Sequence, residues 1–352
     1  MAPSIRYATT SDGVRVAYAE LGAGPEVVCL PPFPLSHLDE MWRLPGITHW
    51  YERLARSAHV VLYDARGSGL SDREGGAAAD CSLEAMSRDL EAVIAAADLR
   101  TPALVAFFNS TPVALDYATR HLDTPAMVLW GGFARGLDVY PLLPPTPREA
   151  AVLEVQRDAL VEAAARAWTA STEDARATAA YFRACTSAGT LLAYASSVRG
   201  WDVRPALAHI QARTLVLQRR DTAAQNPEVA RVLAAALPRG ELRLLAGDAA
   251  SPFAGDIDGG VDALAAFLGL TSRISGGIGD AMPSTPALPE SITPREVEVL
   301  ALLARGLSNK EMAARLGLSV NTVERHLTNV YPKIGARGRT EATAFALRHG
   351  LA

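Results

Sequence analysis

Nucleophilic catalysis needs a serine or cysteine whose proton an adjacent histidine can take, so these residue types are considered first. Ser110 and His121 lie eleven positions apart in one predicted helix, and a separation of about 16 Å along its axis excludes a hydrogen bond between them. Cys81 has no histidine near it in the sequence, and its distance from one in the fold is left open.

The cysteines give no sign of a metal site or of a disulfide framework. The chain has three of them, Cys29, Cys81 and Cys185, without a Cys-x-x-Cys pair or a cysteine–histidine cluster. An odd and sparse set is typical of reduced thiols in the cytosol. No metal and no cofactor is therefore expected.

The first 270 residues alternate short apolar strands with helices. Strands are predicted at 5–9, 14–19, 26–30, 59–64, 103–107, 126–130, 214–218 and 242–245. Helices are predicted at 47–57, 82–98, 110–121, 226–237 and 261–268. This alternation predicts an α/β fold whose mainly parallel sheet is covered by helices on both faces.

Two further features complete this part of the chain. Residues 133–203 are mostly helix-forming and rich in alanine, and the stretch 64–71 has the pattern Asp-x-Arg-Gly-x-Gly-x-Ser. With the order of elements, these features resemble the α/β-hydrolase fold over about residues 5–270, and especially the hydrolase-like domains attached to bacterial signalling modules. The resemblance implies a doubly wound, mainly parallel sheet with a helical cap at about 133–203, inserted after the sixth strand.

The same resemblance implies positions for a nucleophile on a strained turn, an acid and a histidine, in that chain order. Phe108 stands at the position of the nucleophile and has no nucleophilic atom. Thr222 stands at the position of the acid, with Asp221 one residue earlier, and Ala250 stands at the position of the histidine. Because residues 210–325 contain no histidine, the usual general base is missing, and we expect no enzyme activity.

Loss of the triad would leave a cavity at the carboxyl ends of the strands, between sheet and cap. Topology places aromatic side chains and one carboxamide near it: Phe33, Phe107, Phe108, Asn109, Phe133, Tyr140, Tyr194, Trp201 and Phe253. These residues are predicted to bind a small, largely apolar ligand. Each aromatic ring can equally pack the core, and Phe108 could instead fill the cavity and leave a scaffold for dimerisation.

The last 60 residues predict a separate group of helices. An apolar stripe at 297–303 predicts the first helix. Ser308, with Glu311 three residues later, forms a capping box for a short second helix, and Ser319 caps a longer third helix after Gly317. Two helices joined by a short turn containing glycine form a helix-turn-helix, whose second helix can enter a major groove.

This segment resembles the LuxR/GerE family of DNA-binding domains. The residues at the spacing of the family are Thr293-Pro294-Arg295-Glu296, Gly306-Leu307-Ser308-Asn309-Lys310-Glu311, Ala313, Leu316, Ser319, Thr322-Val323, His326, Lys333 and Arg339-Thr340-Glu341-Ala342. Pro332 departs from the pattern and is expected to end or kink the recognition helix. The alternative is a helical bundle used only for protein contacts.

The resemblance also implies DNA-contacting roles. Glu324, Arg325 and Thr328 match base-facing positions, where arginine pairs with guanine and glutamate accepts from cytosine N4. The residues expected at phosphates are Ser308, Asn309, Lys310, Ser319, Asn321, Thr322, Lys333 and Arg337. Members of the family usually bind two half-sites as dimers, and the last helix, 340–351, is the expected dimer element.

The charge distribution agrees in part with this assignment. Residues 288–352 hold nine Lys or Arg against six Asp or Glu, and residues 1–287 hold twenty-five against thirty-two. Both lysines of the chain, Lys310 and Lys333, fall in the smaller segment. A modestly basic segment on an acidic body favours phosphate contact by that segment alone.

The expected organisation is a sensor domain at 1–270, a linker at 271–290 rich in glycine, serine and proline, and a DNA-binding domain at 291–352. The amino terminus does not have the pattern of a signal peptide, and no apolar run reaches the length of about 18 residues expected of a membrane-spanning helix. A cytoplasmic protein is expected.

The sequence thus predicts a transcriptional regulator whose partners are double-stranded DNA, a small-molecule effector and a second copy of the chain. Two alternatives stay open: an active hydrolase attached to a DNA-binding domain, and a constitutive DNA-binding dimer whose large domain is only a scaffold. No receiver pattern precedes the helix-turn-helix, so control by phosphorylation is not indicated.

Overall fold

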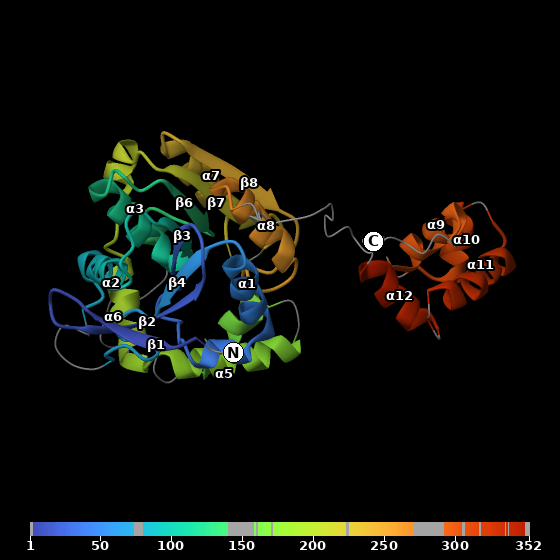
Figure 1. Ribbon diagram of the computed structural model, residues 1–352, viewed down its shortest axis with the longest axis horizontal. Helices are drawn as coiled ribbons and strands as arrows, with labels where there is room; N and C mark the ends of the chain where they lie inside the picture. Colours follow the sequence, from blue (N-terminus) through green and yellow to red (C-terminus); the bar gives the residue numbers. More distant parts are fainter. Residues whose placement is uncertain are drawn as a thin grey trace, which may run out of the picture. The chain divides into compact units, whose positions relative to one another are not determined.

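A computed structural model describes most of the chain, and its residues cluster in two compact units, Met1–Arg273 and Ile274–Ala352 (Figure 1). The described residues are 3–73, 80–139, 158–159, 161–169, 172–222, 225–270, 292–304, 307–316, 318–334, 336 and 338–348. The predicted linker, 271–290, lies outside them, and the exact domain bounds stay a prediction.

The larger unit is built on one sheet, in which the described strands have the order β1-β2-β4-β3-β5-β6-β7-β8. They are β1 (Ile5–Thr9), β2 (Arg15–Gly22), β3 (Glu26–Leu30), β4 (His59–Tyr63), β5 (Ala103–Phe107), β6 (Ala126–Trp130), β7 (Arg213–Arg219) and β8 (Gly240–Leu245). β2 is antiparallel to β1 and β4, and the pairs from β4 to β8 are parallel. The predicted mainly parallel α/β sheet is confirmed.

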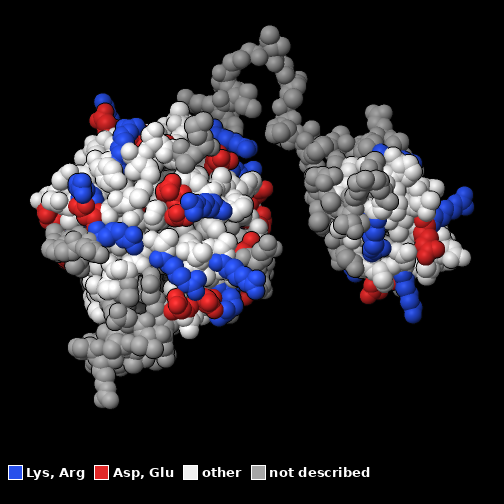
Figure 2. All heavy atoms as spheres, turned by 90° about the horizontal axis from the view of Figure 1, so that it is seen from below, with Lys and Arg blue, Asp and Glu red and all other residues white. Residues whose placement is uncertain are grey.

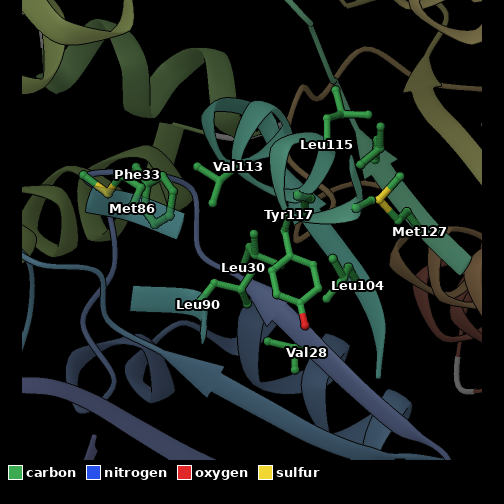
Figure 3. Close-up of a cluster of buried hydrophobic side chains, with 14 of the residues drawn as sticks. Val28, Leu30, Phe33, Met86, Leu90, Leu104, Val113, Leu115, Tyr117 and Met127 are labelled. Carbon is green, nitrogen blue, oxygen red and sulfur yellow. The ribbon is translucent and has the colours of Figure 1, made fainter. Parts of the chain in front are cut away.

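Helices cover both faces of this sheet because every residue of its central strands β5 and β6 is apolar and buried. On one face lie α2 (Leu83–Ala96), α3 (Thr111–Arg120) and α7 (Pro227–Ala236). On the other lie α1 (Pro45–Ala55) and α8 (Ile257–Leu268). In Figure 3, Val28, Leu30 and Leu104 from the strands lie in one cluster with Leu90 from α2 and Val113 from α3.

Successive strand residues face opposite sides of the sheet, so neighbours in sequence belong to different cores. Val28 packs in the core under α2 and α3, whereas Val27 and Cys29 pack in the core under α1 and α8. The alternation continues to the end of β5, where Phe107 packs with Val105 in the core under α1 and α8.

The chain between β6 and β7 is largely helical where the structure describes it. It contains helical residues 161–168, α5 (Thr172–Cys185), α6 (Ala188–Val198) and the 3-10 helix η5 (Arg204–His209). Residues 140–157 lie outside the described part, and the cap bounds 133–203 therefore stay a prediction. None of the helices in the described ranges combines the length and apolarity that a membrane span requires.

The smaller unit contains the helices α9 (Pro294–Ala304), α10 (Asn309–Leu316), α11 (Val320–Lys333) and α12 (Arg339–Arg348). Their apolar faces share one core that includes Leu300, Met312, Val323 and Phe345. Helix α11 ends one residue after Pro332, where a proline lacks the N–H that an extended helix would need.

Candidate functional site

The turn between β5 and α3, residues Phe107–Thr111, is called the elbow below. Phe108 has φ +51, a left-handed conformation that costs a side-chain-bearing residue about 1–2 kcal/mol. Ser110 Oγ accepts a hydrogen bond from the N–H of Phe107 at 2.9 Å, and Thr111 Oγ1 donates to the carbonyl of Phe108 at 2.7 Å. These bonds hold a strained strand-to-helix turn of the kind that presents a nucleophile in α/β-hydrolases, with a phenylalanine at its tip.

The other two positions predicted for a triad follow β7 and β8. Thr222 is buried, and Asp221 next to it is exposed. Ala250 lines the same cavity as Phe108, and its carbonyl accepts a hydrogen bond from Trp130 Nε1 at 2.9 Å. The N–H of Ala250 donates to the carbonyl of Ala167 at 3.3 Å, which connects this loop to the helical residues 161–168.

The main cavity lies at the elbow and has a volume of about 440 Å³. Its described lining residues are Pro32, Phe33, Leu35, Phe108, Asn109, Gly131, Gly132, Phe133, Asp138, Val139, Ala164, Ala167, Trp168, Gln218, Gln225, Asn226, Val229 and Ala250. Its volume lies within the range of about 300–1,000 Å³ that is usual for small-molecule sites. The main cavity can therefore hold a ligand of ordinary size.

Four of the nine predicted ligand residues line the main cavity: Phe33, Phe108, Asn109 and Phe133. Asn109 Nδ2 donates to the carbonyl of Phe33 at 2.8 Å, which joins the elbow to the loop after β3. The ring of Phe108 lies 5.0 Å from that of Trp168, centroid to centroid, with an angle of 38° between the planes.

Four of the other five predicted ligand residues lie elsewhere in the described structure. Phe107 is fully buried under α1, 5.3 Å from the ring of Phe253, and does not line the main cavity. Phe253 lines a second cavity of about 260 Å³. Tyr194 and Trp201 form an edge-on ring pair at 5.6 Å in the core under α2 and α3. Tyr140 lies outside the described residues.

Sequence reasoning missed several lining residues. Trp168 lines both larger cavities and forms part of the boundary between them. It is the one tryptophan between residues 131 and 200, which is the signal that could have drawn attention to it. Gln218 at the end of β7 and Gln225 before α7 had no motif to mark them.

The Asp-x-Arg-Gly-x-Gly-x-Ser stretch supports the main cavity from outside. Asp64 Oδ2 accepts hydrogen bonds from the N–H groups of Leu38 at 3.0 Å and Leu70 at 2.9 Å, which fixes the loop after β3. Burial raises the pKa of Asp64 to about 6. Arg66 is fully buried and pairs with Asp89 at 2.7 Å. These residues hold the backbone in place and do not line the main cavity.

A second candidate site lies on the recognition helix α11. Val323, Leu327 and Val330 are buried at helical spacing and fix the orientation of the helix. The side chains of Glu324 and Arg325 are exposed on the opposite face, as are those of Asn321 and Thr328. In Figure 2, basic and acidic side chains are visible on each of the two units.

The predicted caps of α10 and α11 are confirmed. The N–H and Oγ of Ser308 each donate to Glu311 Oε2 at 2.7 Å, and the N–H of Thr322 donates to Ser319 Oγ at 3.2 Å. The hydrogen bond with Ser308 lowers the pKa of the Glu311 carboxyl. Both helices thus begin with polar groups on the surface, which suits contacts with phosphate oxygens.

Two predicted phosphate residues have partners inside the smaller unit. Lys333 Nζ lies 2.9 Å and 2.8 Å from the two carboxylate oxygens of Glu296, a residue of α9 that is 3% exposed. Burial opposes ionisation of Glu296, but the bonds from Lys333 and Thr293 outweigh it and lower its pKa. Asn309 Oδ1 accepts from Arg339 Nη1 at 3.1 Å.

Lys310 is exposed in the first turn of α10, where a cation can meet a phosphate. Arg337 lies outside the described residues. The DNA contacts of every residue named in the sequence analysis stay predictions.

Residues 290–346 match the family model for bacterial regulatory proteins of the luxR family. The response regulator Rre1 of Synechocystis is 51% identical over 59 residues, which are 17% of this chain and 26% of that protein. The transcriptional regulatory protein LiaR of Bacillus subtilis is 44% identical over 66 residues, 18% of this chain and 31% of that one.

This chain thus covers about a third or less of the curated relatives that it matches. The matched segment includes α9, α10 and α11. The carboxyl-terminal part of the chain is a LuxR-type helix-turn-helix domain.

Solved structures resemble the larger unit. An esterase from Exiguobacterium antarcticum aligns with a TM-score of 0.62 at 20% identity, over 75% of this chain and 98% of that one. The enol-lactonase from Burkholderia xenovorans aligns with a TM-score of 0.61 at 19% identity, over 75% of this chain and 100% of that one. Identities this low show the fold alone, and the larger unit has the α/β-hydrolase fold.

Proposed function

We propose that this protein is a sequence-specific transcriptional regulator whose α/β-hydrolase-like domain binds a small, largely apolar ligand and thereby modulates DNA binding. One observation carries the proposal. The chain joins a LuxR-type helix-turn-helix to a hydrolase fold whose main cavity is open while Phe108 occupies the tip of the elbow.

The lining of the main cavity supports binding without turnover. Its described part contains no serine, threonine, cysteine or histidine, so it offers no nucleophile beside a base. Ala250, which stands at the histidine position, has no proton to exchange. We propose that the domain is a pseudoenzyme, without metal or cofactor, in a cytoplasmic regulator.

Modulation of DNA binding requires a ligand that binds one arrangement of the protein more tightly than another. We propose a homodimer that contacts two half-sites through two α11 helices. Glu324, Arg325 and Thr328 would face the bases, and the capped ends of α10 and α11 would face phosphates.

Native mass spectrometry of the purified full-length protein tests the sensor proposal first. A dimer that carries a releasable small molecule is the expected result. The released compound would then be titrated against protein bound to a DNA duplex selected from a random pool. A change in affinity of about fivefold or more is expected, in line with usual coupling energies.

Two results would favour the alternatives. Hydrolysis of small esters that Asp221→Asn abolishes would favour an active hydrolase, although Asp221 is exposed and does not line the main cavity. Equal DNA affinity with every bound compound would favour a constitutive regulator. The open volume of about 440 Å³ supports the sensor over a scaffold whose cavity is filled.

A further inference from the structure

The main cavity has almost no charge on its described walls. Among its described lining residues, Asp138 is the one with an ionisable side chain, and that carboxylate is bound by Arg135 Nε at 2.9 Å and Nη2 at 2.5 Å. No described Lys, Arg or His lines the main cavity to neutralise an anion. Because burial of an unpaired carboxylate is costly, such a wall disfavours acids.

Carboxamides supply the polar part of the wall instead. Asn109, Gln218, Gln225 and Asn226 come from three separate loops or strand ends and all line the main cavity. Asn109 is bonded to the carbonyl of Phe33. Asn226 Oδ1 accepts from the N–H of Glu228 and thereby caps α7. A carboxamide offers both a donor and an acceptor without charge, which matches polar but uncharged ligands.

Gln225 is the carboxamide with unused hydrogen-bonding capacity. Its Oε1 atom is buried and has no hydrogen-bond partner among the described residues. Exchanging the oxygen and nitrogen of this amide would leave a buried donor at the same place. As placed, Oε1 lacks a hydrogen-bond partner among the described residues, whereas buried polar atoms in folded proteins nearly always have one.

The position of Gln225 is fixed by its neighbours. A Cβ at Gly131 would lie 2.4 Å from Gln225 Nε2, so the missing side chain of Gly131 makes room for the carboxamide. Gln218 is 1% exposed, and its Nε2 donates to the backbone carbonyl of Gln225 at 3.3 Å. The carboxamide of Gln225, whose Oε1 has no hydrogen-bond partner among the described residues, is thus fixed in the wall of the main cavity.

We infer that the main cavity selects an uncharged ligand with an apolar ring body and one amide-like or hydroxyl group that hydrogen-bonds to Gln225. The rings of Phe108, Phe133 and Trp168 would contact the apolar body. This inference rests on the proposed function, because it names the chemical class of the ligand of the same site.

The amino end of α7 could favour an anion there, since helix amino termini attract negative charge. It is already occupied. Asn226 caps the helix, Pro227 has no N–H to offer, and Glu228 places a negative charge in the first turn. The helix terminus therefore does not reverse the preference for an uncharged ligand.

Matched trios of probes test the inference on the full-length protein. Each trio shares one ring, benzene, naphthalene or indole, and carries a carboxamide, a carboxylate or an aminomethyl group. Affinities are measured by isothermal titration calorimetry at neutral pH. We expect the carboxamide of at least one ring to bind about tenfold or more tightly than its carboxylate and its amine, because both charged forms lose hydration.

Variants of Gln225 locate the contact. Gln225→Glu is expected to weaken the carboxamide at least about fivefold and to strengthen the aminomethyl probe, because it places a carboxylate opposite the ligand's polar group. Gln225→Met keeps the length without charge and should weaken the carboxamide alone. Gln211→Glu is the matched control, since Gln211 is exposed and does not line the main cavity. Unfolding temperatures confirm that each variant is folded.

The outcomes separate the two proposals. Carboxylates that bind as well as carboxamides would overturn the inference and leave the sensor intact. Carboxamides that bind equally to both Gln225 variants would also overturn it. If no probe of any charge bound, the inference would fall, and the sensor proposal would be decided separately by the native mass spectrum.

Discussion

The elbow of the larger unit and the recognition helix of the smaller unit differ in whether their side chains, as well as their backbone, suit the chemistry expected of them. At the elbow, the backbone has the strained geometry of a nucleophile turn, but Phe108 carries no nucleophile. Helix α11 lies in the segment that matches the luxR family model, and its side chains Glu324 and Arg325 are exposed and polar. Backbone geometry alone therefore does not establish chemistry, and function must be argued from the side chains of each site.

The left-handed conformation of Phe108 is unfavourable, and it does not present a nucleophile, so neighbouring groups must stabilise it for another reason. Phe108 is 9% exposed and packs against Trp168. On the other side, Ser110 Oγ accepts from the N–H of Phe107 and Thr111 Oγ1 donates to the carbonyl of Phe108, which defines the turn. We infer that packing and these bonds offset the left-handed conformation, and that the ring serves as a wall of the main cavity.

The largest expected effect is at the elbow, with Phe108→Ala against Phe108→Gly. Loss of the buried ring should lower the free energy of unfolding by about 3 kcal/mol in the alanine variant. The glycine variant should be about 1 kcal/mol more stable than the alanine variant, because glycine adopts positive φ without steric cost. Urea denaturation followed by tryptophan fluorescence measures this, since all five tryptophans lie in the larger unit.

If the alanine variant were at least as stable as the glycine variant, the backbone at residue 108 would carry no strain. In that case the elbow would not have the strained backbone of a nucleophile turn. Equal stability of both variants and the parent protein would instead show that the ring of Phe108 contributes no packing.

The next effect concerns the pair of Lys333 and Glu296 in the smaller unit. Lys333→Met leaves a buried carboxylate without its partner and should destabilise this unit by about 2–3 kcal/mol. Because the pKa of Glu296 is lowered in the fold, the contribution of the pair is present at neutral pH. It is lost as the pH falls below the unfolded value and through the folded pKa.

Circular dichroism at 222 nm, compared with tryptophan fluorescence, separates the smaller unit from the larger one. The double variant Glu296→Gln with Lys333→Met is the control, since it leaves no buried charge. If Lys333→Met left the helical transition unchanged at pH 7, the pair would be only a surface contact.

The regular parts of both units could be predicted from the sequence because their signals are local. Apolar runs gave the strands, and Ser308 and Ser319 marked the starts of α10 and α11. Strand alternation would place Phe107 and Phe108 on opposite faces, but it stops at the elbow, where Phe108 has positive φ and both rings belong to one apolar cluster. The sequence therefore could not show that Phe108 lines the main cavity and Phe107 does not. The partner of Lys333 lies 37 residues away, on another helix, and no local pattern indicates it.

The third effect is on DNA recognition by α11. Arg325→Ala should weaken binding to the selected duplex by about 2 kcal/mol and relax the preference for one base pair, if this exposed arginine contacts guanine. Asn329→Ala is the control, because Asn329 is exposed on the same helix and has no assigned contact. Selection from a random pool with each variant measures the preference. If Arg325→Ala kept the same base preference, the base-reading role that the LuxR resemblance implies for Arg325 would be wrong.

The smallest expected effect distinguishes the two lysines of the smaller unit. Lys310 is exposed, so Lys310→Ala should weaken all duplexes alike and reduce the slope of log affinity against log salt by about 1. Lys333 neutralises Glu296 inside the unit, so Lys333→Ala should lower the folded fraction and leave the slope nearly unchanged. Fluorescence anisotropy over a salt series measures both slopes. A reduced slope for Lys333→Ala would mean that the lysine contacts phosphate as well, and that the ion pair holds it in place for DNA.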